Sequence, residues 1–198
     1  VEILGATFLA DEDYIIREAN QEYVERELEW YKSQSRYVQD IPGDTPTIWK
    51  TVSTTDEGKI NSNYGWCIWS DENYNQYENV IETLLENPNS RRATMIYNRP
   101  SMHEDYNQDG MSDFICTYAN GFFIRDGKLH SHYLLRSNDL VFGYNNDKAW
   151  ADYVHDELLS ELQQYDKFED LEKGDLIWTA SSAHVYERHF KFIEELIN

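Results

Sequence analysis

The sequence has little cysteine and little positive charge. Its 198 residues include two cysteines, Cys67 and Cys116, and 17 lysines and arginines against 37 aspartates and glutamates, a formal net charge of −20. Two cysteines form neither a disulfide framework nor a four-cysteine metal site, so a reducing cytoplasm is the expected location. The negative charge argues against direct nucleic-acid binding, because the phosphate backbone would be repelled, although a few local arginines can still hold a nucleotide.

Long apolar runs are also missing. No stretch approaches the roughly 20 apolar residues of a membrane-spanning helix, and no signal-peptide pattern opens the chain, so we expect no membrane association. Aromatic residues, in contrast, are abundant at 15% of the chain, with 15 tyrosines and 6 tryptophans. They argue against disorder and, with the length, predict a single domain over residues 1–198 with a substantial core.

Local patterns predict both strands and helices, and so an α/β or α+β layer fold. Expected strands cover 2–9, 93–97, 114–124, 129–135 and 176–180, and expected helices cover 18–33, 73–86, 147–165 and 185–197. Asp126-Gly127, between two of the strands, is a strong β-hairpin signal. Residues 35–62 and 99–113 are expected to be mainly loop.

Residues 105–110 imitate the start of a calcium-binding loop. The bidentate glutamate at loop position 12 would be residue 116, which is Cys116. We therefore expect an ordinary turn here, and no metal ion.

Cys116 is a candidate nucleophile. An isolated cysteine is more often an inert buried residue, so its neighbours must decide. Counted outward from the predicted hairpin turn, Arg136 lies at a similar height on the second strand, and its guanidinium would favour the thiolate. The alternative is that Arg136 is a surface residue with an exposed ion pair.

Three further groups could act on a nucleotide, although each also has a structural explanation. Arg91 and Arg92 precede a strand, as suits bidentate phosphate binding, but could simply be solvated. Glu27 lies beside apolar residues on a predicted helix, where a raised pKa would suit proton transfer, but could belong to a solvated face. His184 and Tyr186 would point the same way in extended structure and could hold a sugar hydroxyl, or could pack at a strand end.

Together, these segments resemble a known family. The chain is similar to the thymidylate synthase superfamily, and within it to the deoxycytidylate (dCMP) hydroxymethylases of T-even bacteriophages. The resemblance covers nearly the whole chain, and its joint order and spacing are highly specific. The matching segments, in family order, are ELEWYKS (27–33), DIPGDTP (40–46), INSNYGW (60–66), NPNSRR (87–92), RPSMHEDYNQDGMSDFICT (99–117), RSNDLVFG (136–143) and HVYERHF (184–190).

The resemblance implies an enzyme whose fold is a mixed β-sheet packed by helices. Cys116 would add to C6 of the pyrimidine, and C5 would then attack the one-carbon unit of 5,10-methylenetetrahydrofolate, with loss of tetrahydrofolate. A hydroxymethylase quenches the resulting exocyclic methylene with water, whereas a thymidylate synthase uses hydride. The expected product is 5-hydroxymethyl-dCMP for modified phage DNA.

The resemblance also assigns roles to the other candidates. Glu27 matches a proton-relaying glutamate, and the arginine pair Arg91 and Arg92 matches residues that reach the phosphate from the other subunit. It therefore implies a homodimer with shared active sites and a sheet face as the interface. The remaining matches are Arg136 and Ser137 for phosphate, His184 and Tyr186 for ribose, and Trp49, Asp139 and Gly143 for folate.

Asp147 is the expected determinant of the base. Members that act on dUMP have an asparagine four residues after the glycine that matches Gly143. A protonated carboxyl can instead accept from the 4-amino group of cytosine and donate to N3. Asn145 and Asn146 precede Asp147, but the unbroken spacing from Arg136 to Gly143 favours Asp147.

Some features leave other functions open. Residues 118–121 differ from the family, with Gly121 in place of a glutamine, and the family pattern includes a basic loop before and a tail after the matched part. The alternatives are a CMP or dUMP hydroxymethylase, a thymidylate synthase-like transferase and a non-catalytic nucleotide-binding homologue.

Overall fold

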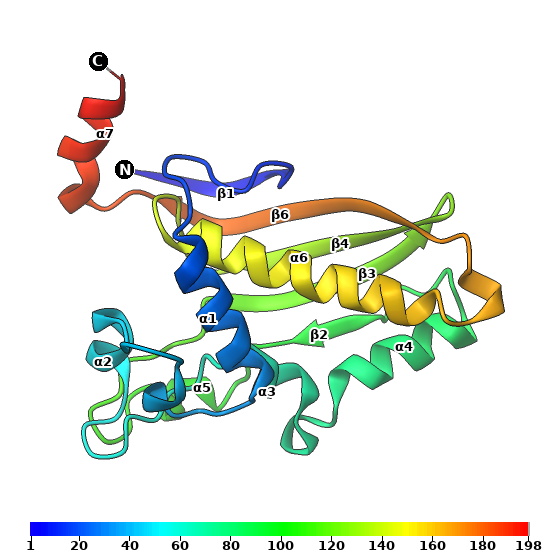
Figure 1. Cartoon of the computed structure of the whole chain (residues 1–198), viewed down its shortest axis with the longest axis horizontal. Helices are drawn as coiled ribbons and strands as arrows, with labels where there is room; N and C mark the ends of the chain where they lie inside the picture. The colour runs from blue at the N-terminus through cyan, green and yellow to red at the C-terminus, as the bar shows by residue number, and fades with distance from the viewer. Residues whose placement is uncertain (198) are drawn as a thin grey trace.

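The structure is built around one mixed β-sheet. This computed structural model describes residues 1–197. The sheet has six strands in the order β1-β6-β4-β3-β2, with the short β5 paired to β6 (Figure 1). β4 and β5 run parallel to β6, and the other pairs are antiparallel. The strands are β1 (Glu2–Leu9), β2 (Thr94–Ile96), β3 (Thr117–Arg125), β4 (Lys128–Leu135), β5 (Asn138–Asp139) and β6 (Glu172–His184).

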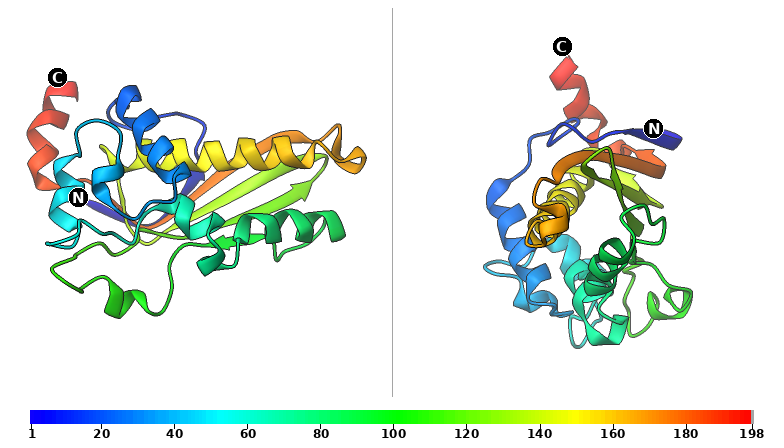
Figure 2. Two further views of the ribbon diagram at one scale, coloured as in Figure 1. Left: turned by 60° about the horizontal axis from the view of Figure 1, so that its bottom comes forward. Right: turned by 90° about the vertical axis from the view of Figure 1, so that its right-hand side faces the viewer.

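Helices lie on one face of this sheet, except α7, which projects beyond the end of β6 (Figures 1 and 2). The α-helices are α1 (Gln21–Lys32), α2 (Thr47–Val52), α3 (Tyr64–Trp69), α4 (Gln76–Glu86), α5 (Met102–Asp105), α6 (Gly143–Leu162) and α7 (Phe190–Ile197). Short 3₁₀ helices cover Val38–Asp40, Asp71–Asn73, Asp166–Phe168 and Glu187–His189. None of the helices in the described chain is long and apolar enough to cross a membrane.

The core between helices and sheet is aromatic. Trp150 of α6 is fully buried, and its ring contacts those of Tyr31 on α1, Tyr64 on α3 and Trp69 on α3. Offset and edge-to-face ring pairs of this kind add to the free energy gained from apolar burial. They hold α1, α3 and α6 together at the carboxyl end of β4.

The predicted hairpin is confirmed. Asp126 and Gly127 both have positive φ, at 51° and 73°, as a two-residue turn matching the strand twist requires. The turn fixes the register of β3 and β4, with Arg125 opposite Lys128 at one end and Thr117 opposite Leu135 at the other.

Several predicted boundaries were wrong, with α1, α4 and β3 each beginning three residues later than expected, and α2, α3, α5 and β5 were not predicted. α6 begins at Gly143 rather than at 147, because tertiary contacts hold a first turn of weak helix formers. Tyr144 donates to the carbonyl of Glu12, and Asn145 donates to that of Arg17. β6 is longer than predicted at both ends, and α7 begins five residues later than predicted.

Candidate active site

Cys116 and Arg136 meet at the open end of the β3–β4 hairpin. Cys116 immediately precedes β3 and Arg136 immediately follows β4, and the backbone N–H of Arg136 donates to the carbonyl of Cys116 at 2.8 Å. An Nη of Arg136 lies 3.6 Å from Cys116 Sγ. The same guanidinium donates to the carbonyls of Phe114 and Ile115, which fixes its direction. The predicted pairing is confirmed.

The thiol is nevertheless not ionised by this contact. Burial raises the pKa of Cys116 to about 11, and the Arg136 guanidinium, which lowers it, only partly compensates. The expectation that Arg136 favours the thiolate was correct in direction, but burial outweighs it. Cys116 therefore holds its proton at neutral pH and needs a base when it attacks.

Asp147 lies in the second turn of α6. Its Oδ2 accepts from the Asn138 amide at 3.1 Å, and its Oδ1 lies 3.4 Å from the Tyr64 hydroxyl. Burial, followed by the negative charge of Glu27, raises the pKa of Asp147 to about 8. The carboxyl is therefore largely protonated at pH 7, and can donate as well as accept.

Glu27 is a second buried carboxyl with a raised pKa. It lies on α1, is only 4% exposed, and accepts from the Tyr23 hydroxyl and, at 3.2 Å, from the indole N–H of Trp49. Burial raises its pKa to about 7, although both hydrogen bonds lower it. A pKa near neutral allows Glu27 to take up and release protons, as the sequence analysis expected.

Hydroxyl groups connect Asp147 to the strands. Thr117 Oγ1 donates to the Tyr64 hydroxyl at 3.0 Å and lies 3.0 Å from the Tyr133 hydroxyl. Tyr64 is held at the start of α3, where Asn63 caps the helix by accepting from the N–H of Trp66. Tyr64 is a site residue that was not predicted, although the INSNYGW segment contains it. A single tyrosine in the sequence gives no signal that distinguishes a site residue from a core residue.

Asp139, His184 and Tyr186 also come together. Asp139 of β5 pairs with His184 at the end of β6, and the rings of His184 and Tyr186 are 4.7 Å apart. Ser137, partly buried, precedes β5 and follows Arg136. Next to them, a Cβ on Gly143 would lie 3.4 Å from Asp139 Cβ and 4.0 Å from Asp147 Oδ2. The glycine thus leaves room between the two carboxyls.

Arg91 and Arg92 lie away from this group within the chain. Both are exposed, and the next residue, Ala93, accepts from the N–H of Phe122. Phe122 is six residues beyond Cys116 along the sheet, roughly 20 Å at strand spacing. One chain by itself therefore does not bring the arginine pair to the cysteine.

Comparison with known proteins assigns the chain to a family. A sequence profile described as thymidylate synthase matches residues 15–198. The chain belongs to the thymidylate synthase family. Within that family, it is 52% identical over 198 residues to the deoxycytidylate 5-hydroxymethyltransferase of Enterobacteria phage T2, covering 100% of this chain and 80% of the relative.

Other members of the thymidylate synthase family are similar to different extents. The deoxycytidylate 5-hydroxymethyltransferase of Enterobacteria phage T4 is 53% identical over 98% of this chain and 78% of its own length. A thermostable thymidylate synthase A from Bacillus subtilis superposes on the whole chain and on 70% of its own with a TM-score of 0.74, at 20% identity. The predicted mixed α+β fold is thus confirmed.

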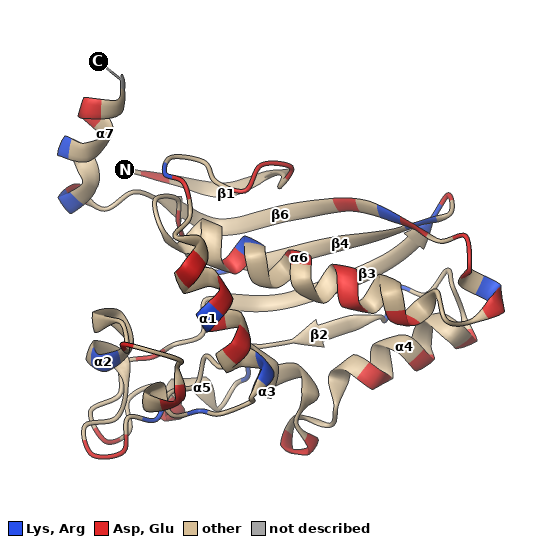
Figure 3. Ribbon diagram, in the orientation of Figure 1, with Lys and Arg blue, Asp and Glu red and all other residues tan. Residues whose placement is uncertain are grey.

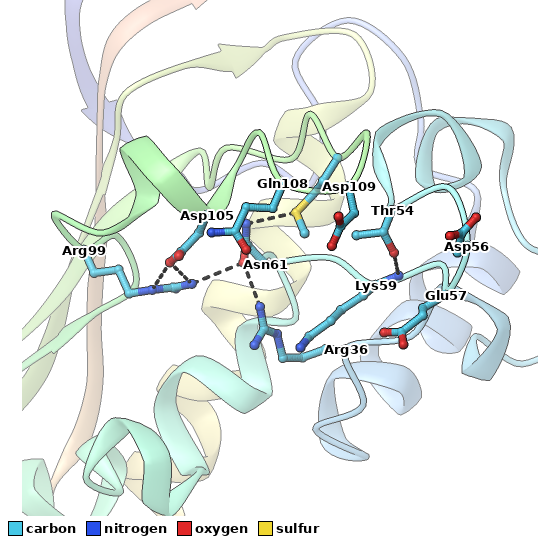
Figure 4. Close-up of a pocket in the computed structure, with 11 residues that line it drawn as sticks. Arg36, Thr54, Asp56, Glu57, Lys59, Asn61, Arg99, Asp105, Gln108 and Asp109 are labelled. Carbon is cyan, nitrogen blue, oxygen red and sulfur yellow. Dashed lines mark hydrogen bonds and ion pairs between the residues drawn. The ribbon is translucent and has the colours of Figure 1, made fainter.

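A separate cavity lies between residues 54–61 and the loop after β2 (Figure 4). Arg36 and Arg99 both donate to Asn61 Oδ1 in it, and Arg99 is paired with Asp105 at 2.9 Å. None of the predicted site residues lines this cavity. Among residues 1–197, no three histidine, cysteine, aspartate or glutamate side chains are grouped to hold a metal ion.

Proposed function

We propose that this chain is a deoxycytidylate 5-hydroxymethyltransferase. The reaction converts dCMP, 5,10-methylenetetrahydrofolate and water into 5-hydroxymethyl-dCMP and tetrahydrofolate, which in a phage supplies a modified base for DNA. Relatives that cover nearly the whole chain at 52% and 53% identity carry this name. The observation that carries the proposal for the site is the buried Asp147 carboxyl, which is held by Asn138 and lies close enough to Cys116 to raise the pKa of its thiol.

Asp147 reads the base in this proposal. Cytosine presents an amino donor at C4 and an acceptor at N3, whereas uracil presents an acceptor at O4 and a donor at N3. A carboxyl with a pKa of about 8 offers one acceptor oxygen and one hydroxyl donor at pH 7. A mismatched buried polar edge can lower kcat/KM for the wrong base by roughly 10⁴.

Cys116 is the nucleophile. Its sulfur forms a bond to C6, which makes C5 electron-rich, and the thiol proton passes to a base. After C5 has attacked the one-carbon unit, C5 loses its proton and tetrahydrofolate leaves, which gives an exocyclic methylene. Water then adds its oxygen to this methylene, the sulfur is eliminated from C6, and the proton of the water returns to the thiolate. Glu27 relays protons through water to the pyrimidine, because its pKa of about 7 lets it both give and accept one.

The folate would lie over Gly143, next to Asp139 and Trp49. When bound, it supplies a one-carbon unit at the oxidation level of formaldehyde. The absence of a side chain at Gly143 supports this placement, because a Cβ there would stand between Asp139 and Asp147, 3.4 Å from Asp139 Cβ. Trp49 also contributes indirectly, since its indole N–H orients Glu27.

The phosphate and ribose are held from two sides. Arg136 and Ser137 would contact the phosphate from within the chain, and His184 with Tyr186 would hold the sugar. Arg91 and Arg92 would come from a second subunit, because in their own chain they lie roughly 20 Å along the sheet from Cys116. We therefore propose a homodimer with shared active sites.

The uncovered face of the sheet suits such a dimer. The strand residues that alternate with the buried core residues lie on this face. Charged residues in the strands occur toward the strand ends and not in the centre of the sheet, although the chain carries a net −20 (Figure 3). Large apolar residues on it are exposed, including Leu9 and Ile96. An uncharged patch spanning several strands is typical of an interface between copies. Its side chains include Thr7, Leu9, Ile96, Phe123, His132, Leu134, Ile177 and Thr179.

Tritium release from C5-labelled nucleotides tests the proposed reaction. We expect the parent to release tritium from dCMP far faster than from dUMP or CMP, and Asp147→Asn to prefer dUMP, because an amide is complementary to uracil. Release from dUMP alone by the parent would refute the assignment of Asp147.

Cys116→Ser is the companion variant. It should bind dCMP like the parent but lose turnover by several orders of magnitude, because the hydroxyl is a much weaker nucleophile. If parent and variant bind equally and neither turns over, the chain is a nucleotide-binding homologue and the enzyme proposal fails.

A further inference from the structure

Asn138 lies between an indole and the Asp147 carboxyl. It is 1% exposed on β5, and Trp178, on the neighbouring β6, is 0% exposed. Trp178 Nε1 donates to Asn138 Oδ1 at 3.2 Å, and Asn138 Nδ2 donates to Asp147 Oδ2 at 3.1 Å. The three residues come from three different elements and form one buried chain of hydrogen bonds.

The indole decides which way the amide faces. An asparagine side chain can present either its oxygen or its nitrogen to a neighbour, but a tryptophan Nε1–H is only a donor. Asn138 must therefore turn Oδ1 to Trp178, which leaves Nδ2 facing Asp147. The Trp178 ring is itself fixed, because it stacks on Tyr133 at 4.8 Å and meets Tyr144 edge-on at 5.2 Å.

The amide in turn decides where the proton of Asp147 resides. Oδ2 accepts from Nδ2 at 3.1 Å and so presents a lone pair there, whereas the Tyr64 hydroxyl faces Oδ1 at the longer distance of 3.4 Å. Because the shorter hydrogen bond is the stronger one, a neutral carboxyl then carries its proton on Oδ1. This matters because a neutral carboxyl that is free to exchange its proton between the two oxygens can match cytosine in one form and uracil in the other. With the proton fixed on Oδ1, only one of these two pairings remains for a base held in place by its sugar and phosphate.

We propose that Asn138, oriented by Trp178, is a positioning residue that sets base selectivity by confining the Asp147 proton to Oδ1. The inference rests on the proposed function, in which Asp147 pairs with the base. Neither Asn138 nor Trp178 needs to touch the substrate. Their effect should appear in the choice between dCMP and dUMP rather than in turnover as such.

Trp178→Phe tests the first link, because it removes the N–H and keeps a ring in the stack. We expect the ratio of kcat/KM for dCMP over dUMP to fall about tenfold, the equivalent of one buried hydrogen bond. Trp150→Phe is the matched control. Its Nε1 is equally buried but donates to the Tyr97 hydroxyl at 3.0 Å, so the ratio should not change.

Asn138→Leu tests the second link and the order of the chain. It should lower the ratio at least as much, and adding Trp178→Phe to it should lower the ratio no further, because Trp178 acts through Asn138. Additive losses in the double variant, or a parental ratio in either single variant, would overturn the inference. If Asn138→Leu does not fold, Asn138→Ser takes its place.

The outcomes separate this inference from the proposal on which it rests. If Asp147→Asn still prefers dCMP, the base-reading role of Asp147 fails. If Asp147→Asn prefers dUMP while Trp178→Phe and Asn138→Leu keep the parental ratio, only the present inference fails. The dissociation constants of dCMP and dUMP, measured in the Cys116→Ser background, report the base preference without turnover.

Discussion

At the residue scale, the site consists of two buried acids, Glu27 and Asp147, and one thiol, that of Cys116. Burial disfavours the charged forms of both acids, so Asp147 remains largely protonated near neutral pH, while Glu27 titrates in that range. The charge that Glu27 carries when it is ionised further raises the pKa of Asp147. The same burial keeps Cys116 as a thiol. A buried acid that must hold its proton makes the folded state dependent on pH.

Glu27→Gln should remove part of the pH dependence of the free energy of unfolding. Between about pH 4.5 and 7, the folded chain binds more protons at Glu27 than the unfolded chain does, so the free energy of unfolding falls as pH rises. For a shift of this size, the loss is on the order of 3 kcal/mol. The variant should match the parent in stability near pH 5, exceed it at pH 8, and lose turnover.

Urea unfolding at pH 5, 6, 7 and 8 measures the free energy of unfolding of the parent and of Glu27→Gln. Glu25→Gln, on the exposed face of the same helix, is the control and should follow the parent. Equal pH dependence of stability in Glu27→Gln and the parent would contradict a raised pKa of Glu27.

At the element scale, two glycines near helix starts have different tasks. Gly65, in the first turn of α3, lets this helix meet α1, since a Cβ there would lie 1.8 Å from the carbonyl oxygen of Tyr31. Gly143, the first residue of α6, meets only ordinary contact distances. One glycine therefore serves packing, and the other keeps a surface open.

Alanine at each position separates these tasks. Gly65→Ala should destabilise the fold by about 2–3 kcal/mol, because the backbones must move apart, and should reduce turnover by displacing Tyr64. Gly143→Ala should change stability by less than about 1 kcal/mol but raise KM for folate more than KM for dCMP. Thermal unfolding and steady-state kinetics measure both, and the reverse pattern would show that the roles are misassigned.

At the scale of the whole molecule, one chain is an incomplete site. Its arginine pair and its cysteine lie at different ends of β3, and the sheet exposes an uncharged face. Both features follow if the second copy covers that face and supplies the arginines, as closed two-fold symmetry allows.

Mixing inactive subunits tests this arrangement. Cys116→Ser and the double variant Arg91→Ala/Arg92→Ala should each be nearly inactive, yet an equal mixture should regain roughly a quarter of parental activity, because half of the dimers are mixed and each has one intact site. Sedimentation should show a dimer at micromolar concentration. A monomer, or a mixture without activity, would contradict shared sites.

Local periodicity and turn chemistry were sufficient to predict five of the six strands and the hairpin, and the family segments were recognised by their order and spacing. The turn at Asp126-Gly127 placed Cys116 and Arg136 at similar heights, and the register shift between Thr117 and Ala119 brings them opposite each other. Which acidic groups hold a proton became clear from the tertiary structure, because burial leaves no local pattern in the sequence. The same is true of contacts between residues that are far apart in the chain, such as Tyr64 and Asp147 (83 residues apart) or Asn138 and Trp178 (40 residues apart). For the same reason, the thiol that seemed activated by Arg136 alone is held neutral by everything packed around it.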